Sequence, residues 1–341
     1  MAKFSELGND LYTGKRSFDI IGRRKLWYAI AGILILISVV GPFLRGGFVF
    51  GIEFSGGSQF SISQVSNASQ QAGIDAVKSV EPAAVPLVTT LGQNGIRIQT
   101  DQLDDAASSQ VRDALATAYS VQPSDVTINF IGPTWGQDIT GQAIRGLLIF
   151  IALAAVFMAI YFRTWKIALS AMIALLHDLV ITAGIYGITG FEITPAAVIG
   201  FLTILGYSLY DTVVVFDKIR ENTSEWGDKA TRTFGETVNL AVNQTLVRSI
   251  NTSVVAMLPV ASILVIGAFV LGAGTLRDIS LALLIGIFVG TYSTIFIASP
   301  LYAQLREREP KVKKIDQRVV SQRANRDKSV VAPATAEQLS A

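Results

Sequence analysis

Six long apolar runs stand out in the pattern of hydrophobic and polar positions along the chain. They cover residues 26–44, 142–162, 166–188, 193–216, 247–272 and 279–303. A helix needs about 20 mainly apolar residues to cross the hydrocarbon core of a bilayer. Each run is near that length, so the pattern predicts a multi-span α-helical membrane protein with six transmembrane helices.

The segment between the first two runs, residues 45–137, has the shorter periods of a folded α+β domain. Its elements in order are an alternating strand GSQFSISQV, a short helix AGIDAVKSV, two strands in VPLVTTLGQNGIRIQT around Gln93, Asn94 and Gly95, a helix capped at Asp101, and a last strand DVTINFI. Asn-Gly is a strong hairpin signal. The order β-α-β-β-α-β predicts a ferredoxin-like domain, whose two helices cover one sheet face and leave the other open to a partner.

Lysine and arginine residues concentrate in alternate connections between the runs. Residues 1–25, 163–166, 217–246 and the tail after residue 305 hold 21 of the 28 basic residues. Cytoplasmic loops of membrane proteins carry such an excess. We therefore expect a multi-pass protein of the cell membrane with both termini in the cytoplasm, and we expect residues 45–137 to be exported.

Three segments are predicted to be cytoplasmic: residues 1–25, the connection 217–246 and the tail 306–341. Apolar residues of the connection recur at helical spacing, namely Phe234, Val238, Ala241 or Val242, and Leu246. This spacing indicates either an amphipathic helix at the membrane surface or a simple connector lying on the bilayer. The tail is polar and mixed in charge, which predicts a largely disordered arm that touches anionic lipid or a ribosome.

Composition excludes several functional classes. Half of the residues are hydrophobic and 16% are charged, so a single soluble globule is excluded. The chain has no cysteine and one histidine, which argues against disulfides, thiolate chemistry and a metal site. The net charge of +2 gives no reason to expect nucleic acid as a partner. No phosphate-binding GKS or GKT is present, so energy would come from a partner or an ion gradient. We expect no enzymatic reaction, no cofactor and no metal.

Ionisable residues inside the runs are the candidates for function, because charge in a membrane is costly. Asp211 lies six residues before the expected cytoplasmic boundary at Asp217, about 9 Å inside the membrane. Arg248 lies just inside the next run, and its long side chain can reach Asp211 if the two helices pack together. Arginine does not lose its proton, so Asp211 is the candidate proton carrier and movement of Arg248 would switch its proton affinity.

Two polar residues accompany this pair. Ser208 precedes Asp211 by three residues and Asn251 follows Arg248 by three, which places each on the helical face of its neighbour and makes a water chain feasible. The alternative is a static buried salt bridge between Asp211 and Arg248 that fixes helix packing.

His177 and Asp178 fall in the middle of the third run. Adjacent helical residues point about 100° apart, so we expect these two side chains not to share a simple hydrogen bond. Asp178 is the better candidate for a proton relay, while His177 is equally well explained as an interhelical hydrogen-bond donor.

Small residues and one proline are candidates for helix packing or a hinge. Gly200, Gly206, Gly286 and Gly290 allow close helix approach. Pro259 lies in the fifth run, where it is expected to kink the helix and free a carbonyl group.

Four segments resemble one known family. GYSLYDTVVVFDKIREN (206–222), NQTLVRSINTS (243–253), LHD (176–178) and EFSGGSQF (53–60), the last with Gly56 and Gly57, are similar to motifs of the SecF family. SecF proteins are the smaller subunits of the bacterial SecDF protein-export complex, in the RND superfamily. The resemblance covers residues 15–308, with Leu209 and Tyr210 departing from the usual motif.

The resemblance implies a half-transporter that pairs with SecD into twelve spans in the bacterial inner membrane. It would use the proton-motive force to complete export of preproteins through the SecYEG channel, after SecA has acted, with Asp211 and Arg248 at positions tied to proton transport. An alternative is a non-transporting scaffold that links SecD, YajC and YidC to the channel. A stand-alone small-molecule exporter is a weaker third reading, because RND drug pumps need two such halves.

Overall fold

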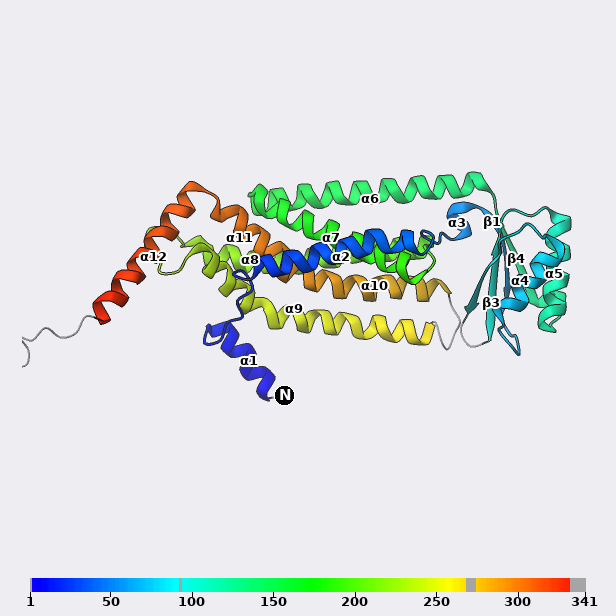
Figure 1. The fold of residues 1–341 in the computed structure, drawn as a ribbon, viewed down its shortest axis with the longest axis horizontal. Helices are drawn as coiled ribbons and strands as arrows, with labels where there is room; N and C mark the ends of the chain where they lie inside the picture. The colour runs from blue at the N-terminus through cyan, green and yellow to red at the C-terminus, as the bar shows by residue number, and fades with distance from the viewer. Residues whose placement is uncertain (1, 92–93, 268–273, 332–341) are drawn as a thin grey trace, which may run out of the picture.

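The computed structural model describes residues 2–91, 94–267 and 274–331. Within them, six helices are long and apolar enough to cross a membrane, which confirms the prediction of a multi-span helical protein. These helices are α2 (Arg24–Leu44), α6 (Pro133–Phe162), α7 (Trp165–Thr189), α8 (Pro195–Ser224), α9 (Phe234–Val265) and α10 (Gly274–Ser293), the last continued by the π-helical turn η3 (Thr294–Ala298) and α11 (Ser299–Glu307). They form an elongated bundle with a small sheet at one end and helices α1 (Ala2–Thr13) and α12 (Pro310–Val331) at the other (Figure 1).

Local sequence signals set the helix ends. The Thr194 side chain accepts a hydrogen bond from Ala197 N at 3.2 Å, which caps α8, and Pro195 fills the first helical position. Thr233 and Glu236 form a reciprocal capping box at the start of α9. α7 ends at Gly190, whose φ of +74° is the left-handed conformation that glycine adopts without strain.

The sheet domain is built from residues 57–131. Its elements are β1 (Gly57–Ile62), α4 (Gln70–Val80), β2 (Leu87–Leu91), β3 (Gly95–Thr100), α5 (Asp105–Tyr119), the 3₁₀ turn η1 (Pro123–Asp125) and β4 (Val126–Ile131). The strand order is β2-β3-β1-β4, and all neighbouring strands are antiparallel. Helix α5 begins later than the expected Asp101, because Asp104 is the residue that caps it, accepting from Ala107 N at 2.7 Å. Gln93 of the expected hairpin turn lies outside the described residues.

The two faces of this sheet differ in chemistry. Phe60, Ile96 and Ile98 point toward α4 and α5 and are fully buried. The opposite face carries Arg97 and Gln99, which make hydrogen bonds to the turn between α7 and α8. The expectation that this face is open is wrong for β3, where Arg97 and Gln99 contact the end of the bundle. It is right for β4, where Thr127 and Asn129 of the same face are exposed. The sheet lies against that end of the bundle in Figure 1.

Small residues let α8 and α10 approach closely in the middle of the bundle. A methyl group at Gly200 would lie 2.6 Å from Ala282 Cβ, and one at Gly286 would collide with Ile204. A methyl group at Gly206 would meet no atom within 4 Å, so this glycine does not mark a close contact. Pro259 lies at an exposed position within α9, which runs on to Val265.

The connection 217–246 differs from both expectations. Helix α8 continues to Ser224 and α9 begins at Phe234, so only residues 225–233 connect the two spans. The apolar face starting with Phe234 and Val238 is buried in one core cluster with Ile21 and Tyr302. A surface-bound amphipathic helix is thus wrong for this face, because protein rather than bilayer covers it.

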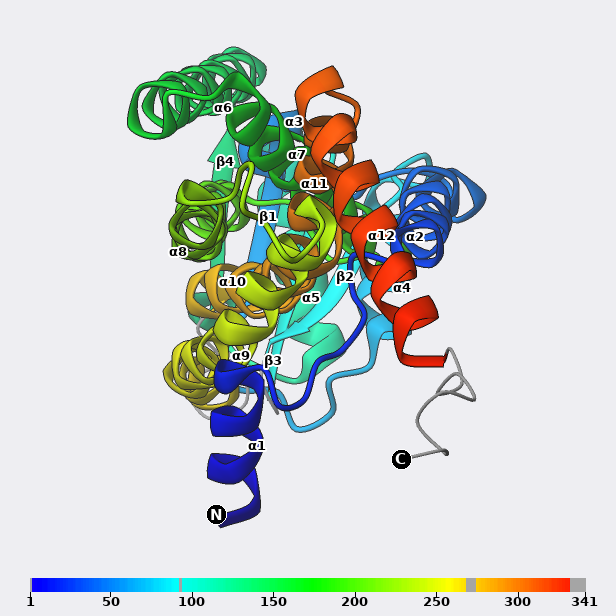
Figure 2. The same ribbon diagram turned by 90° about the vertical axis from the view of Figure 1, so that its left-hand side faces the viewer.

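The C-terminal segment is helical over α12 (Pro310–Val331), so the predicted disorder of the tail is wrong there; residues 332–341 lie outside the described residues. Val312, Ile315 and Val319 recur at helical spacing and are buried. Their burial holds α12 across the end of the bundle, as Figure 2 shows. Asp316 Oδ1 also accepts a hydrogen bond from Phe234 N at 2.8 Å.

The N-terminal segment forms α1 (Ala2–Thr13) and then a strap of residues 17–21 along the start of α9. Asn243 Oδ1 accepts a hydrogen bond from Phe18 N at 2.7 Å, and Asn239 Oδ1 accepts one from Ile20 N at 2.9 Å. Two asparagines four residues apart therefore satisfy backbone donors of a segment that has no regular structure of its own.

Candidate functional site

Asp211 is a buried carboxylate on α8, 4% exposed in the middle of the helix bundle. Its Oδ1 accepts a hydrogen bond from Ser249 Oγ of α9 at 2.8 Å. Its Oδ2 is buried and has no hydrogen-bond partner among the described residues. An ionised carboxylate with half of its acceptors unpaired is costly in such a place, and a protonated one costs less because it carries no charge.

Arg248 does not pair with Asp211 in this structure. Helices α8 and α9 pack together as the hypothesis required, but Ser249 faces Asp211 and Arg248 lies one residue away on the exposed side of α9. Successive residues of a helix point about 100° apart, so the two neighbours cannot both face α8. Arg248 acts on Asp211 only through longer-range electrostatic attraction. Asn251 is also exposed and stands apart from this contact.

A second buried carboxylate lies on α7. Asp178 Oδ2 accepts a hydrogen bond from Ser208 Oγ of α8 at 2.6 Å. Asp178 Oδ1 lies 3.2 Å from His177 Nδ1, and His177 Nε2 is buried without a partner among the described residues. The expectation that these adjacent side chains do not share a hydrogen bond is therefore wrong, because the imidazole ring is long enough to bridge the angle between them.

Ser208 therefore contacts Asp178 rather than Asp211, although Ser208 and Asp211 lie on one face of α8. Gly290 of α10 lies directly against this hydrogen bond between α7 and α8. A methyl group there would lie 3.0 Å from Ser208 Oγ and 3.5 Å from Asp178 Oδ2. The backbone of α10 therefore seals the contact between α7 and α8.

Hydroxyl groups that the sequence analysis did not select continue the polar contacts between helices. Thr212 and Thr294 hydroxyls lie 2.9 Å apart, which joins α8 to the π-helical turn η3. On the α9 side, Thr245, Ser249 and Ser253 are all buried at intervals of four residues. The interval of four residues between these small hydroxyl side chains is a signal that would have found Ser249.

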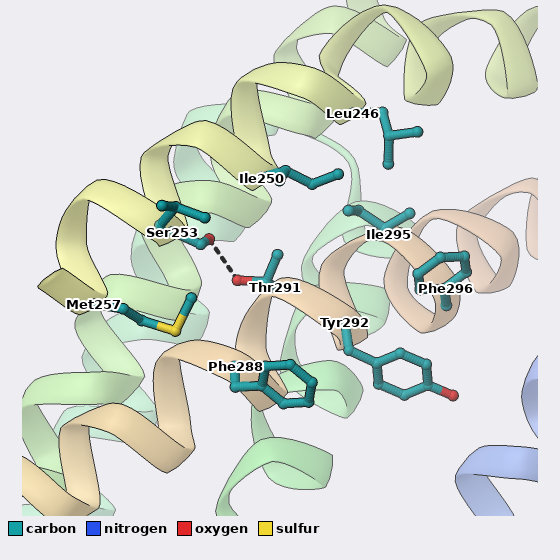
Figure 3. Close-up of a pocket in the computed structure, with 10 residues that line it drawn as sticks. Leu246, Ile250, Ser253, Met257, Phe288, Thr291, Tyr292, Ile295 and Phe296 are labelled. Atoms are coloured by element: carbon teal, nitrogen blue, oxygen red, sulfur yellow. Dashed lines mark hydrogen bonds between the residues drawn. The ribbon is translucent and has the colours of Figure 1, made fainter. Parts of the chain in front are cut away.

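A groove lies between α9 and α10, and Figure 3 shows the side chains that line it. Its volume is about 370 Å³ and its walls are almost entirely apolar, including Ile250, Met257 and Phe288. Ser253 and Thr291 hydroxyls lie 2.5 Å apart across it and satisfy each other. The groove therefore offers no charged group to a polar ligand and stands apart from the carboxylates.

The chemistry open to this arrangement is binding and release of protons. Each buried carboxylate has one hydroxyl donor from a neighbouring helix, at Asp211 from Ser249 and at Asp178 from Ser208. Among the described residues, no three of the acidic and histidine side chains come together as a metal site would require. Neither carboxylate is placed beside a nucleophile with an activating base.

Gly56 and Gly57 have a structural role at the entry to β1. Their φ angles are +75° and +139°, a region that favours glycine. A methyl group at Gly57 would lie 2.5 Å from the carbonyl oxygen of Thr100 on the paired strand. The pair therefore forms the turn that leads from the short helix α3 (Ile52–Ser55) into the sheet.

Comparison with known proteins finds relatives along most of this chain. Residues 110–308 match the family described as protein export membrane protein SecD/SecF, C-terminal. A protein translocase subunit SecF from Streptomyces coelicolor is 44% identical over 95% of this chain and 86% of that protein. A protein translocase subunit SecF from Rhodothermus marinus is 36% identical over 86% of this chain and 94% of that protein.

A solved structure extends the likeness to three dimensions. The crystal structure of SecDF, a translocon-associated membrane protein from Thermus thermophilus, superimposes with a TM-score of 0.74 at 28% identity over 86% of this chain. This chain spans 39% of that SecDF chain. The family model covers more than half of the chain, and the relatives and the solved structure cover most of it: the chain is a multi-pass membrane protein that belongs to the SecF family of protein-export proteins.

Proposed function

We propose that this chain pairs with SecD and uses the proton-motive force to complete preprotein translocation through the SecYEG channel. The observation that carries the proposal is Asp211, a buried carboxylate with one hydrogen bond and one unpartnered oxygen. A group in this position gains much from a proton and holds it away from water. It is therefore suited to load a proton from one side and release it to the other.

The energy available is adequate for such a cycle. One proton crossing a membrane potential of 100 mV supplies about 2.3 kcal/mol. An ionised carboxylate in the bundle favours any arrangement that brings a cation or a donor to its free oxygen. Arg248, one residue from Ser249 and free of an ion pair with Asp211, is the cation that would approach after the proton leaves.

Asp178 is the second carboxylate of the proposed pathway. It is joined to α8 through Ser208, so a change of charge on Asp178 acts on the helix that carries Asp211. His177, with its free Nε2, extends this site on α7. We assign Asn251 no contact in this state and retain it as a candidate for the open path beside Arg248.

The proposed orientation places the sheet domain outside the bacterial inner membrane and both termini in the cytoplasm. The element order and antiparallel sheet support a ferredoxin-like exported domain. Its motion would keep a preprotein from sliding back after SecA has acted. YajC and YidC are proposed further neighbours, membrane lipids surround the six spans, and no role is proposed for nucleic acid.

The test uses inverted membrane vesicles that contain this protein with SecD and the channel. A preprotein is stalled halfway, ATP is removed, and completion is followed after a proton gradient is imposed. We expect Asp211→Asn to assemble normally but fail to complete translocation. Asp228→Asn is the matched control, because Asp228 is 93% exposed and should work as the wild type does.

The competing function is a scaffold that links SecD, YajC and YidC without transporting protons. The Ser249–Asp211 hydrogen bond favours it to the extent that this contact serves helix packing. Asparagine keeps an acceptor for the Ser249 hydroxyl, so a scaffold should work with Asp211→Asn. Equal completion by both proteins would therefore remove the proton-carrier hypothesis and leave the scaffold.

A further inference from the structure

A buried acidic residue of the bundle, Glu192, contacts the sheet domain. This residue lies in the turn between α7 and α8. Arg97 Nη1 of β3 forms an ion pair with Glu192 Oε2 at 3.3 Å, and Gln99 Nε2 donates to Glu192 Oε1 at 2.6 Å. The side chains of Arg97 and Glu192 are 14% and 3% exposed. Arg97 and Gln99, which lie on the same face of β3, therefore both contact the carboxylate of Glu192.

Glu192 is tied directly to the start of α8. Its neighbour Ile193 exchanges backbone hydrogen bonds with Val49 and Gly51, at 2.8 and 2.9 Å. The next residue, Thr194, caps α8 and also donates to Asp278 Oδ2 of α10 at 3.0 Å. A displacement of Glu192 would therefore act on the start of α8 and on Asp278 of α10. Asp211 lies farther along α8, about 25 Å from this end.

A further carboxylate, Glu53 of α3, faces this contact without a partner. Glu53 Oε2 is buried and accepts no hydrogen bond from the described residues. A methyl group at Gly51 would collide with this oxygen and lie 3.1 Å from Glu192 Oε1, so the two carboxylates face each other across Gly51. Glycine is the residue that leaves room for both.

The surroundings of Glu53 raise its pKa, with burial as the largest cause. Burial raises the pKa of Glu53 most; a backbone hydrogen bond lowers it, Glu192 raises it, Arg97 lowers it and Asp278 raises it, with a net rise. Arg277 is bound to Asp278 at 3.0 Å and is therefore occupied. A proton on Glu53 removes the repulsion toward Glu192 and leaves Arg97 to Glu192 alone.

We propose that Arg97, Glu192 and Glu53 form a proton-sensitive latch that holds the sheet domain against the start of α8. With Glu53 neutral, Glu192 keeps its ion pair and the domain is docked. With Glu53 ionised, two like charges compete for one guanidinium group and the domain loosens.

The sign of the pH dependence follows from the pKa shift. Because the pKa of Glu53 is raised in the docked state, docking gains stability from the proton at low pH and loses it as pH rises through that raised pKa. The latch does not depend on proton transport by Asp211. Export of the sheet domain would place the latch on the proton-rich side of an energised membrane.

The test measures the distance between two spin labels on the full-length chain in lipid nanodiscs. Natural cysteines are absent from the sequence, so Ser109→Cys on α5 and Ser262→Cys on α9, both exposed, accept one label each. Pulsed electron resonance then gives the distance distribution between about pH 5 and pH 9. We expect one narrow distribution in acid and a broadened or shifted one in alkali.

Variants separate the latch from general effects of pH. Glu53→Gln, a neutral isostere, should stay narrow at both pH values, whereas Glu192→Gln should be broad at both. Asp113→Asn, at an exposed carboxylate of α5, should follow the wild type. So should Asp211→Asn, because the latch and the proton carrier are separate. A wild-type distribution that ignores pH, or a Glu53→Gln protein that still responds, overturns the latch.

Discussion

Ser249 rather than Arg248 donates the hydrogen bond to Asp211, at 2.8 Å across the contact between α8 and α9. The two candidate partners are adjacent in sequence, and the turn of the helix gives one of them the buried face and the other the exposed face. The Asp211 carboxylate is therefore bound by the neutral hydroxyl group of Ser249, while the guanidinium group of Arg248 does not pair with it. This arrangement makes Ser249 a positioning residue for the proposed proton carrier.

Replacing Ser249 with alanine should slow proton-driven translocation. A hydrogen bond to a charged group contributes about 1.5–3 kcal/mol, so the ionised Asp211 loses about that much stabilisation. Proton release should then become roughly 10- to 100-fold less favourable. The measurement is completion of a stalled preprotein in vesicles under a proton gradient. Ser249→Thr, which keeps the hydroxyl, should retain most of the wild-type rate, and equal loss in both variants would contradict the role of the hydroxyl.

Gly290→Ala should destabilise the bundle, whereas Gly206→Ala should not. A methyl group at position 290 presses on Ser208 Oγ at 3.0 Å and near Asp178 Oδ2, while one at position 206 meets nothing within 4 Å. Overpacking of this kind costs about 1–3 kcal/mol. Thermal unfolding in detergent should show a lower midpoint for the first variant. The second should match or slightly exceed the wild type, because alanine has the better helix propensity. Similar midpoints for both would show that α10 does not seal this contact.

The spans were predictable from the sequence because the length and polarity of an apolar run directly reflect the bilayer. The strand and helix order of residues 57–131 was equally accessible from alternation and turn residues. By contrast, the face that a membrane helix turns toward its neighbour leaves little trace when nearly all positions are apolar. Asp211 could be selected because of its charge, whereas Ser249 was missed because the neighbouring Arg248 is the stronger partner for a carboxylate; only the interval of four residues that links Thr245, Ser249 and Ser253 pointed to the buried face.

Two other features were hidden for different reasons. Glu192 lies in a short turn, where an acidic residue is ordinary, and only the docking of β3 makes it a buried partner of Arg97. The apolar residues of α12, such as Val319, are separated by many charges and lower the mean polarity little. Their spacing is that of one helix face, but only the tertiary structure shows what covers that face.

Val319→Asp should detach α12 from the end of the bundle, while Val320→Asp should leave it docked. The two neighbours are 1% and 56% exposed, so the same substitution buries a charge in one case and not in the other. Losing a buried valine alone costs about 1.5–3 kcal/mol, enough to raise the undocked fraction roughly 10- to 100-fold. Trypsin should then cleave after Arg318 and Arg323 faster in the first variant. Equal cleavage of both would mean that α12 is not held by this face.

Acid should loosen the junction of α11 and α12 through Glu309. Its carboxylate accepts hydrogen bonds from Lys166 Nζ at 2.5 Å and from Arg306 Nη1 at 2.7 Å. Burial acts to raise the pKa of Glu309, but the hydrogen bonds from Lys166 and Arg306 outweigh it and lower the pKa below its usual value. A group with a lowered pKa in the folded state stabilises that state above its unfolded pKa and loses the contribution as pH falls through the folded one.

The protein is exposed to a chosen pH and then returned to neutral for a short pulse of trypsin. Cleavage of α12 should be faster after exposure to a pH below about 4.3. Glu309→Gln should cleave faster than the wild type at neutral pH and lose most of this acid dependence, because it cannot form the charged contacts. Glu225→Gln, at an exposed position of the preceding connection, is the control and should behave as the wild type. An acid response that persists unchanged in Glu309→Gln would contradict the role of Glu309. Asp316 is not the source of such a response, because burial raises its pKa, so its protonation favours the folded state and acts in the opposite direction.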